Sequence, residues 1–456
     1  MRAIRSLRVP GSVRLRTQDP STVTNTRIAN RAILRLAIPA LGTLAIDPLL
    51  TLIDTAFVAR VGVDELAALG VDTAILGFVF FGFNFLAYAT TPLVAQALGR
   101  GNPVEARRWV GDALVLAALL GLAAAIVVEV LAPWFVGLMG ANDEIAGPAV
   151  AYLRIRGIAT PAVLLVTAGH GAFRGYLDTR TPFRVAVGIN VVNLVLDPLL
   201  IFVVGLGLEG AALGTVIAQW VGALWFLHLI RSRRMADRPA GLRKALPTIL
   251  ALARNGVLVS IRTAFLLLGL TFAAATATRL GPADIAAHQV VMQVWLLAAM
   301  IADAFAIAGQ AMVAEAVGGG ESRATDDLSR RLLLWGVLTG LVLMTAFFLG
   351  GPALACLVTD PTVAALTVSA AAVAGWTMPI GAPLFVADGI FFGLLAFGTI
   401  IVSTALGSAV LVTLISVTPL GESLDGIWWA IGAMLAARGL VFVFGYRRAV
   451  RTALRS

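Results

Sequence analysis

The chain has 456 residues, of which 59% are hydrophobic and 13% are charged. This is about half the charged fraction of a soluble domain, so the composition excludes a water-soluble enzyme and indicates a polytopic membrane protein. The formal charge of +9 does not predict a nucleic-acid partner, because the basic residues lie between apolar segments and not on one polar face. One cysteine, Cys356, excludes disulfides within the chain and cysteine-rich metal sites.

The first 30 residues are basic and have no acid before Asp19. They lack an apolar core, so no secretory signal is predicted. We expect a disordered cytoplasmic tail, with a transit peptide as the alternative.

Twelve apolar segments follow along the chain. A membrane-spanning helix needs about 20 apolar residues, so these segments predict an all-α protein with twelve transmembrane helices. Their approximate ranges are 33–59, 68–97, 109–138, 145–173, 182–205, 210–230, 248–278, 284–316, 332–357, 362–394, 399–418 and 426–446.

Arginine alternates between the loops. Basic residues gather in the N-terminal tail, after the second, fourth, sixth and eighth segments, and at the C-terminus, whereas the other loops are neutral or acidic. The positive-inside rule then predicts that both termini are cytoplasmic, in a multi-pass protein of the plasma membrane. The expected division is a tail (1–30), an N-lobe of six helices (31–230), a cytoplasmic linker (231–247), a C-lobe (248–446) and a C-terminal tail (447–456).

An internal repeat supports this division. With a shift of 219 residues, ARVGVDELAALGV (59–71) aligns with TRLGPADIAAHQV (278–290), and VAQALGRG (94–101) aligns with VAEAVGGG (313–320). The shift spans six helices, so both halves keep one orientation in the membrane. Parallel repeats of this kind place the substrate site between the halves.

Two carboxylates lie in the first apolar segment, IDPLLTLIDTAFVARVG (46–62). Asp47 and Asp54 are seven residues apart and therefore share one helix face, while Pro39 can bend the helix. A charged side chain at the bilayer centre costs roughly 2.5–3.5 kcal/mol on insertion scales, so each acid is a functional-site candidate. For Asp47, pairing with an arginine or contact with the membrane surface is an equal alternative.

The fifth segment contains a second polar stripe, GINVVNLVLDPLLIF. Asn190, Asn193 and Asp197 occupy positions i, i+3 and i+7 and lie along one face. Two amides beside a carboxylate can bind a hard cation or hydrogen-bond either protonation state of the acid. Hydrogen bonding between helices is the structural alternative for the asparagines.

The second half is chemically different. Its acids are Asp303 and Asp388, and Ala273 occupies the place equivalent to Asp54. The buried Arg262 is interpreted as a counter-ion of one of these acids, with contact to an anionic substrate as the alternative. His170 in the first half is either a proton-relay group or a packed histidine.

No Walker A, GxSxG or HExxH motif is present in the sequence. The sequence therefore predicts neither an ATPase nor a hydrolase, and no cofactor or metal centre is expected. Membrane-embedded acids are the means by which secondary transporters respond to an ion gradient. We expect a transporter and not an enzyme.

In combination, these segments resemble the multidrug and toxic compound extrusion (MATE) transporters, specifically the DinF-type branch, which includes plant citrate exporters. The resemblance covers about 33–446. It is carried by Pro39, the segment 46–62, TTPLVAQALG (90–99), the stripe Asn190, Asn193 and Asp197, Thr215, AAHQVVMQVW (286–295) and IADAFAIAGQA (301–311).

The resemblance implies two six-helix lobes around a V-shaped cavity and antiport of protons or sodium ions. It implies a cation or proton site in the N-lobe formed by Asp54, Asn193, Asp197 and Thr215, to which we add Asn190 and Asp47, and a bend at Pro39. A sodium ion would be held by Asp54, Asn193 and Asp197. His170 stands where some relatives carry asparagine, which argues against sodium, and the paired C-lobe acids of the NorM branch are absent.

A further group is expected to line the substrate cavity or the lobe interface: Asp303, Asp388, Gln289, Gln310, Arg262 and His170.

The predicted function is proton-driven export of amphipathic, often cationic, compounds by a monomer whose partners are the bilayer and a small-molecule substrate. Alternatives are export of organic anions such as citrate, indicated by Arg262, and sodium-coupled multidrug export. A membrane-embedded enzyme or lipid scramblase would need polar clusters or headgroup grooves that the sequence does not indicate. We predict that Asp54 and Asp197 exchange the coupling proton.

Overall fold

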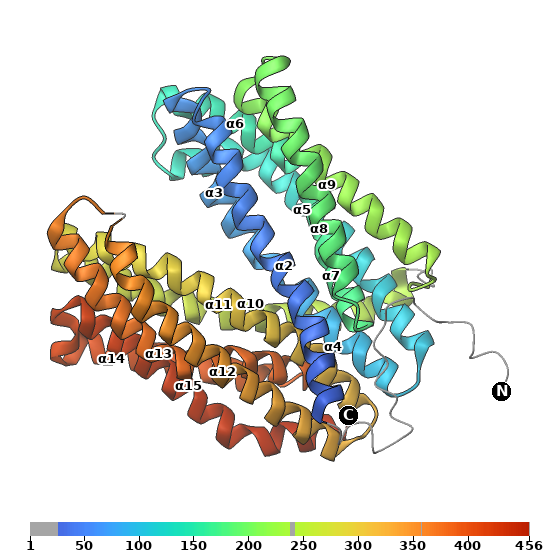
Figure 1. Ribbon diagram of the computed structural model, residues 1–456. Coiled ribbons are helices and arrows are strands. Elements are labelled where there is room, and N and C mark those ends of the chain that lie inside the picture. The colour runs from blue at the N-terminus through green and yellow to red at the C-terminus, as the bar shows by residue number, and fades with distance from the viewer. Residues whose placement is uncertain (1–25, 238–241, 357, 456) are drawn as a thin grey trace. The chain divides into compact units, whose positions relative to one another are not determined.

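The computed structural model describes residues 26–237, 242–356 and 358–455, and over these ranges the chain is helical with no β-strand (Figure 1). The expected all-α class is confirmed. Residues 1–25 of the expected N-terminal tail and residues 238–241 of the expected linker lie outside the described residues.

The first half of the chain forms eight α-helices and one π-helical turn. They are α2 (Thr26–Val58), α3 (Val63–Phe83), α4 (Phe85–Gly99), α5 (Pro103–Leu138), α6 (Asp143–Gly157), α7 (Thr160–Gly175), α8 (Arg180–Pro198), the π turn η2 (Leu199–Val203) and α9 (Gly207–Ser232).

The second half forms six α-helices and one 3₁₀ turn. They are α10 (Leu242–Leu280), α11 (Pro282–Gly318), α12 (Ser322–Ala355), α13 (Pro361–Gly393), α14 (Phe397–Val417), the 3₁₀ turn η3 (Pro419–Glu422) and α15 (Leu424–Ala453).

Ten helices of the described residues are long and apolar enough to cross a membrane, and α6 with α7, bent by 48°, makes up to eleven. The remaining expected segment, 68–97, is divided in the structure into α3 and α4 at Asn84. The multi-pass architecture is therefore clear, and the exact number of twelve spans stays a prediction.

Several helices begin where the sequence supplies a capping side chain. Asn102 accepts a hydrogen bond from the backbone N–H of Glu105 at the start of α5, and Asn142 accepts one from Ile145 at the start of α6. Asp360 does the same for α13 and Ser423 for α15. These side chains satisfy backbone donors that have no partner inside the helix.

The chain divides into two compact units. The first unit holds Gly42–Gly256, and the second holds the chain from Val257 onward together with the start of α2 as far as Leu41. The division falls inside α2 and inside α10, so it differs from the expected lobe ranges by parts of two helices. The lobe boundaries stay a prediction.

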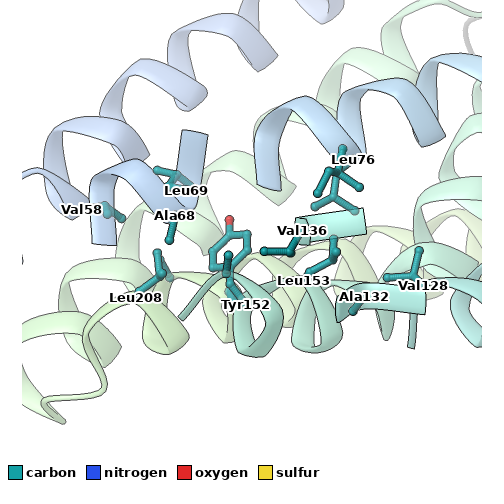
Figure 2. Packing of buried hydrophobic residues seen from close by; sticks show 14 of the residues in the cluster. Val58, Ala68, Leu69, Leu76, Val128, Ala132, Val136, Tyr152, Leu153 and Leu208 are labelled. Atoms are coloured by element: carbon teal, nitrogen blue, oxygen red, sulfur yellow. The ribbon is translucent and has the colours of Figure 1, made fainter. Parts of the chain in front are cut away.

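Two apolar clusters form the core of the first unit. One joins α2, α3, α5, α6, η2 and α9, and Figure 2 shows the Tyr152 ring among its side chains. The other joins α4, α5, α7, α8 and α9. Together they hold α8 and α6, which carry most of the polar residues described below.

In the second unit, α13 packs against α11, α12, α14 and α15. Small residues allow close contact between these helices: a Cβ atom at Gly389 would collide with the backbone of Ala306 in α11, and one at Gly340 in α12 would meet Met378 and Pro379. Such small-residue packing is typical of helices in membranes, where apolar burial gives no advantage over lipid.

Candidate functional site

Two acids from distant parts of the chain meet in the first unit. Asp54 of α2 and Asp197 of α8 lie within hydrogen-bonding reach of each other. Asp197 is fully buried, and both Asp54 Oδ1 and Asp197 Oδ2 are buried with no hydrogen-bond partner among the described residues. The acid of the first apolar segment thus faces the acid of the fifth.

Asn193 connects this pair to α9. Its Nδ2 donates to Asp197 Oδ1 at 2.8 Å and to Thr215 Oγ1 at 3.3 Å, and the Thr215 hydroxyl donates to the carbonyl of Ala211 at 3.0 Å. The structure therefore brings Asp54, Asn193, Asp197 and Thr215 together. Asn193 Oδ1 is a further buried acceptor without a partner in the described part of the chain.

Asn190 lies on the same helix but, in the described part of the chain, has no hydrogen bond to this network. Its Nδ2 donates to the carbonyl of Ala186, four residues earlier on its own helix, at 2.8 Å. The side chain of Asp47 lies outside the described residues. Helix α2 remains helical through Pro39, so the bend expected there stays a prediction.

The backbone around Asp197 departs from a regular α-helix and leaves room for its carboxyl group. Pro198 follows it directly and the chain continues as the π turn η2, a local widening that is common at functional sites. On α9, a Cβ atom at Gly214 would collide with Asp197 Oδ1, so only glycine leaves room for the carboxyl group.

Three further groups near the pair were not identified as candidates from the sequence. Arg156 of α6 acts electrostatically on Asp54, Asp197 and Asp72 of α3, and Tyr152, one turn before Arg156, is buried close to the same charges. Arg156 Nε and Nη1 are buried without a hydrogen-bond partner among the described residues. The sequence signal was available, since Asp72 and Arg156 both interrupt apolar segments.

His170 of α7 is placed against an aromatic side chain. Its ring lies 5.3 Å from the Phe226 ring in an edge-on arrangement, and the charge of Arg174 acts on it electrostatically. Within the described ranges His170 makes no hydrogen bond to either coupling candidate, Asp54 or Asp197. This position favours the packed histidine over the proton relay.

The second unit contains a separate buried ion network. Asp388 of α13 accepts from Arg262 of α10 at 2.5 Å and from Arg438 of α15 at 2.8 and 2.9 Å. Asp303 of α11 is close enough to interact electrostatically with all three. Arg262 is thus a counter-ion, as interpreted from the sequence, and Arg438, which is 0% exposed, is the partner that sequence reasoning missed.

The two glutamines of the second unit differ in exposure: Gln289 is exposed and Gln310 is 2% exposed. Ala273, at the place equivalent to Asp54, is fully buried. Among the described residues no group of three or more His, Cys, Asp or Glu side chains is arranged to hold a metal ion.

Comparison with known proteins identifies the family. A family model described as MatE matches residues 39–199 and 259–418, one match in each half of the chain. The chain belongs to the MatE family. The matches end at the fifth and eleventh predicted segments, so they reproduce the repeat found in the sequence.

Individual proteins that are similar to this chain support the same family assignment. The MatE chain is 33% identical over 419 residues to the protein DETOXIFICATION 44, chloroplastic, of Arabidopsis thaliana, covering 89% of this chain and 80% of that protein. It is 28% identical over 431 residues to the DNA damage-inducible protein F of Escherichia coli (strain K12), covering 92% of both. A crystal structure of MATE in the bent conformation matches with a TM-score of 0.85 at 20% identity, over 94% of this chain and 97% of that one.

Membership in the MatE family establishes the class of function. MatE proteins are transporters and not enzymes, and this chain is a multi-pass membrane protein of the multidrug and toxin efflux type with small-molecule substrates.

Proposed function

We propose that this MatE protein exports amphipathic, often cationic, compounds in exchange for protons, with Asp54 and Asp197 as the coupling acids. The observation that carries the proposal is that the Asp54 carboxyl group lies within hydrogen-bonding reach of the fully buried Asp197 carboxyl group. An ionised carboxylate only accepts hydrogen bonds, so a hydrogen bond between two carboxyl groups requires a proton on one of them. Two carboxyl groups at this separation therefore favour a state in which they share one proton.

Release of this proton would change the forces between α2 and α8. Two unit charges about 4 Å apart repel by roughly 4 kcal/mol at an effective dielectric constant near 20. Arg156 offsets part of this repulsion because it acts on both acids. Proton binding thus biases how α2 packs on α8, and a substrate that prefers one packing competes with the proton.

The same residues favour a proton over a sodium ion as the coupling ion. Sodium would need several oxygen ligands, and Asp54 Oδ1, Asn193 Oδ1 and Asp197 Oδ2 could contribute three. However, Arg156 already places a positive charge near Asp54 and Asp197 and would repel a second cation. A proton needs only two carboxyl groups within hydrogen-bonding reach, which Asp54 and Asp197 provide.

The test is efflux of a fluorescent cationic dye from proteoliposomes with a pH gradient and a sodium gradient imposed separately. The wild-type protein should move dye under the pH gradient alone. Asp54→Asn and Asp197→Asn should each abolish that transport while the protein remains folded and inserted. The matched control is Asp64→Asn, since Asp64 is an exposed acid in the first turn of α3. Full transport by Asp54→Asn, or transport driven by sodium alone, would contradict the proposal.

Export of organic anions is the second candidate, supported by the ion network of the second unit. Arg438 is fully enclosed, but the Arg262 side chain is 17% exposed, so Arg262 is the guanidinium of this network that a substrate carboxylate could reach. In this case proteoliposomes should release labelled citrate under the pH gradient and leave the dye inside. Arg262→Gln would then reduce citrate release.

A further inference from the structure

A groove of about 530 Å³ opens on the second unit, and none of its lining residues belongs to the buried ion network. Its lining residues come from α12, α13 and α15, and α13, which forms the floor, contacts both other helices. The walls and floor are mostly apolar and include Leu333, Ile380, Leu384, Ile390, Phe442 and Val443. The volume lies within the roughly 300–1,000 Å³ range of small-molecule sites.

One end of the groove is polar. Arg330 of α12 and Arg447 of α15 line this end, and both are exposed. Neither arginine forms a salt bridge among the residues that the structure describes. The acid at the same end, Asp326, accepts a hydrogen bond from the Tyr446 hydroxyl at 2.8 Å, a contact that joins the two walls. The end therefore carries two positive charges and one negative charge.

The rest of the groove suits a hydrocarbon chain. The floor runs along one helix from Ile380 to Ile390, a distance of about 15 Å at a rise of 1.5 Å per residue. Val443 is 71% exposed and Ile380 is 45% exposed, so the apolar part is open along its side. Its basic end lies at the start of α12 and the end of α15, the side that the positive-inside rule assigns to the cytoplasm.

We propose that this groove binds one anionic glycerophospholipid from the cytoplasmic leaflet, with its phosphate on Arg330 and Arg447 and an acyl chain over α13. Basic pockets between helices at this depth bind acidic headgroups, and the neighbouring apolar groove retains the chain. Bound lipid would connect α12 to α15 at the point where Tyr446 and Asp326 already meet. An amphipathic cation would be repelled by the two arginines.

The experiment measures binding of fluorescently labelled dioleoyl phosphatidylglycerol to the purified full-length protein in neutral detergent, with labelled dioleoyl phosphatidylcholine as the matched lipid. The anionic lipid should bind at least about tenfold more tightly, because each arginine near the membrane surface favours an anionic headgroup. The double variant Arg330→Gln/Arg447→Gln should remove this preference.

Matched variants separate the groove from general surface charge. Arg323→Gln/Arg448→Gln removes two exposed arginines from the same two helices, but neither residue lines the groove, so the preference should remain. Val443→Trp narrows the groove from its exposed rim without a change of charge and should weaken binding of the anionic lipid.

Equal binding of the two lipids to the wild-type protein would overturn the proposal, and so would an equal loss of preference in both double variants. It would also be overturned if Val443→Trp bound the anionic lipid as tightly as the wild-type protein, or if glycerol phosphate or a cationic dye displaced the lipid. Displacement by glycerol phosphate would indicate a site for free phosphate, and displacement by the dye would indicate a drug site. The readout is binding, so it does not depend on the coupling ion or the exported substrate.

Discussion

Arg156 sets the charge balance of the polar group in the first unit. It acts on three acids, Asp54, Asp72 and Asp197, which come from three different helices. With all four groups ionised the sum of charges is −2, and a shared proton between Asp54 and Asp197 reduces it to −1. A buried site tolerates charge only when it is paired, so this arginine should influence when the acids release a proton.

Replacement of Arg156 by glutamine tests this role. The guanidinium favours the ionised acids, so without it protons bind more tightly and are released only at higher pH. The pH of half-maximal dye efflux should therefore rise, by about one unit if roughly 1.4 kcal/mol of interaction is lost. Efflux from proteoliposomes at a series of internal pH values measures this shift.

Arg154→Gln is the control for Arg156→Gln. Arg154 is on the same helix and loses the same charge, but it is half exposed and pairs with Glu129 at 3.4 Å. Its pH profile should match that of the wild-type protein. An unchanged profile for Arg156→Gln would show that the arginine does not act on the coupling acids.

Helix α15 illustrates how one charged side chain can link several elements. It is apolar over most of its length, yet Arg438 is fully buried and bonds Asp388 of α13, which is also bonded by Arg262 of α10. Ser403 of α14 donates to the carbonyl of Arg438 at 3.2 Å. A single residue thus joins α15 to the packed centre of the second unit.

We expect Arg438→Met to lower the free energy of unfolding by about 3 kcal/mol, because removal of one partner leaves a buried charge with fewer partners. The melting temperature of the purified protein in detergent should fall by several degrees. Arg448→Met, an exposed position ten residues later on α15, should melt like the wild-type protein. Equal melting temperatures for all three proteins would mean that the ion network does not stabilise the second unit.

At the scale of the whole molecule, the two halves share a sequence repeat but carry different chemistry. The first unit pairs two acids with Arg156, whereas the second has Ala273 in the place of Asp54 and an ion network of two arginines and two acids. The family model matches each half in turn. This inequality is the reason for assigning coupling to the N-terminal acids.

The arginine alternation predicts that the N-terminus, the segment 231–247 and the C-terminus are all on the cytoplasmic side. Reporter fusions active only in the cytoplasm, placed at each of these three sites, should all be active, because the basic loops remain on the side where positive charge is retained. A fusion in the loop at 140–142, directly before the acids Asp143 and Glu144 that begin α6, is the control and should be inactive. Activity at only one terminus would contradict an even number of spans.

Much of the architecture could be predicted from local sequence. Every apolar segment became a helix or a helix pair, because the bilayer requires backbone groups to be satisfied within the segment. The cost of an intramembrane acid also indicated Asp54 and Asp197 before any contact was known. Asn193 followed from its place on the same helix face as Asp197.

Partners on other helices were decided only by the tertiary structure. The sequence placed Asn190 and Asn193 on one stripe, but Asn190 bonds Ala186 whereas Asn193 bonds Asp197 and Thr215. It did not connect Arg156 to Asp54 or Arg438 to Asp388, since these residues are 102 and 50 positions apart. Periodicity shows which residues share a helix face, and only the rotation and packing of the helices determine what that face meets.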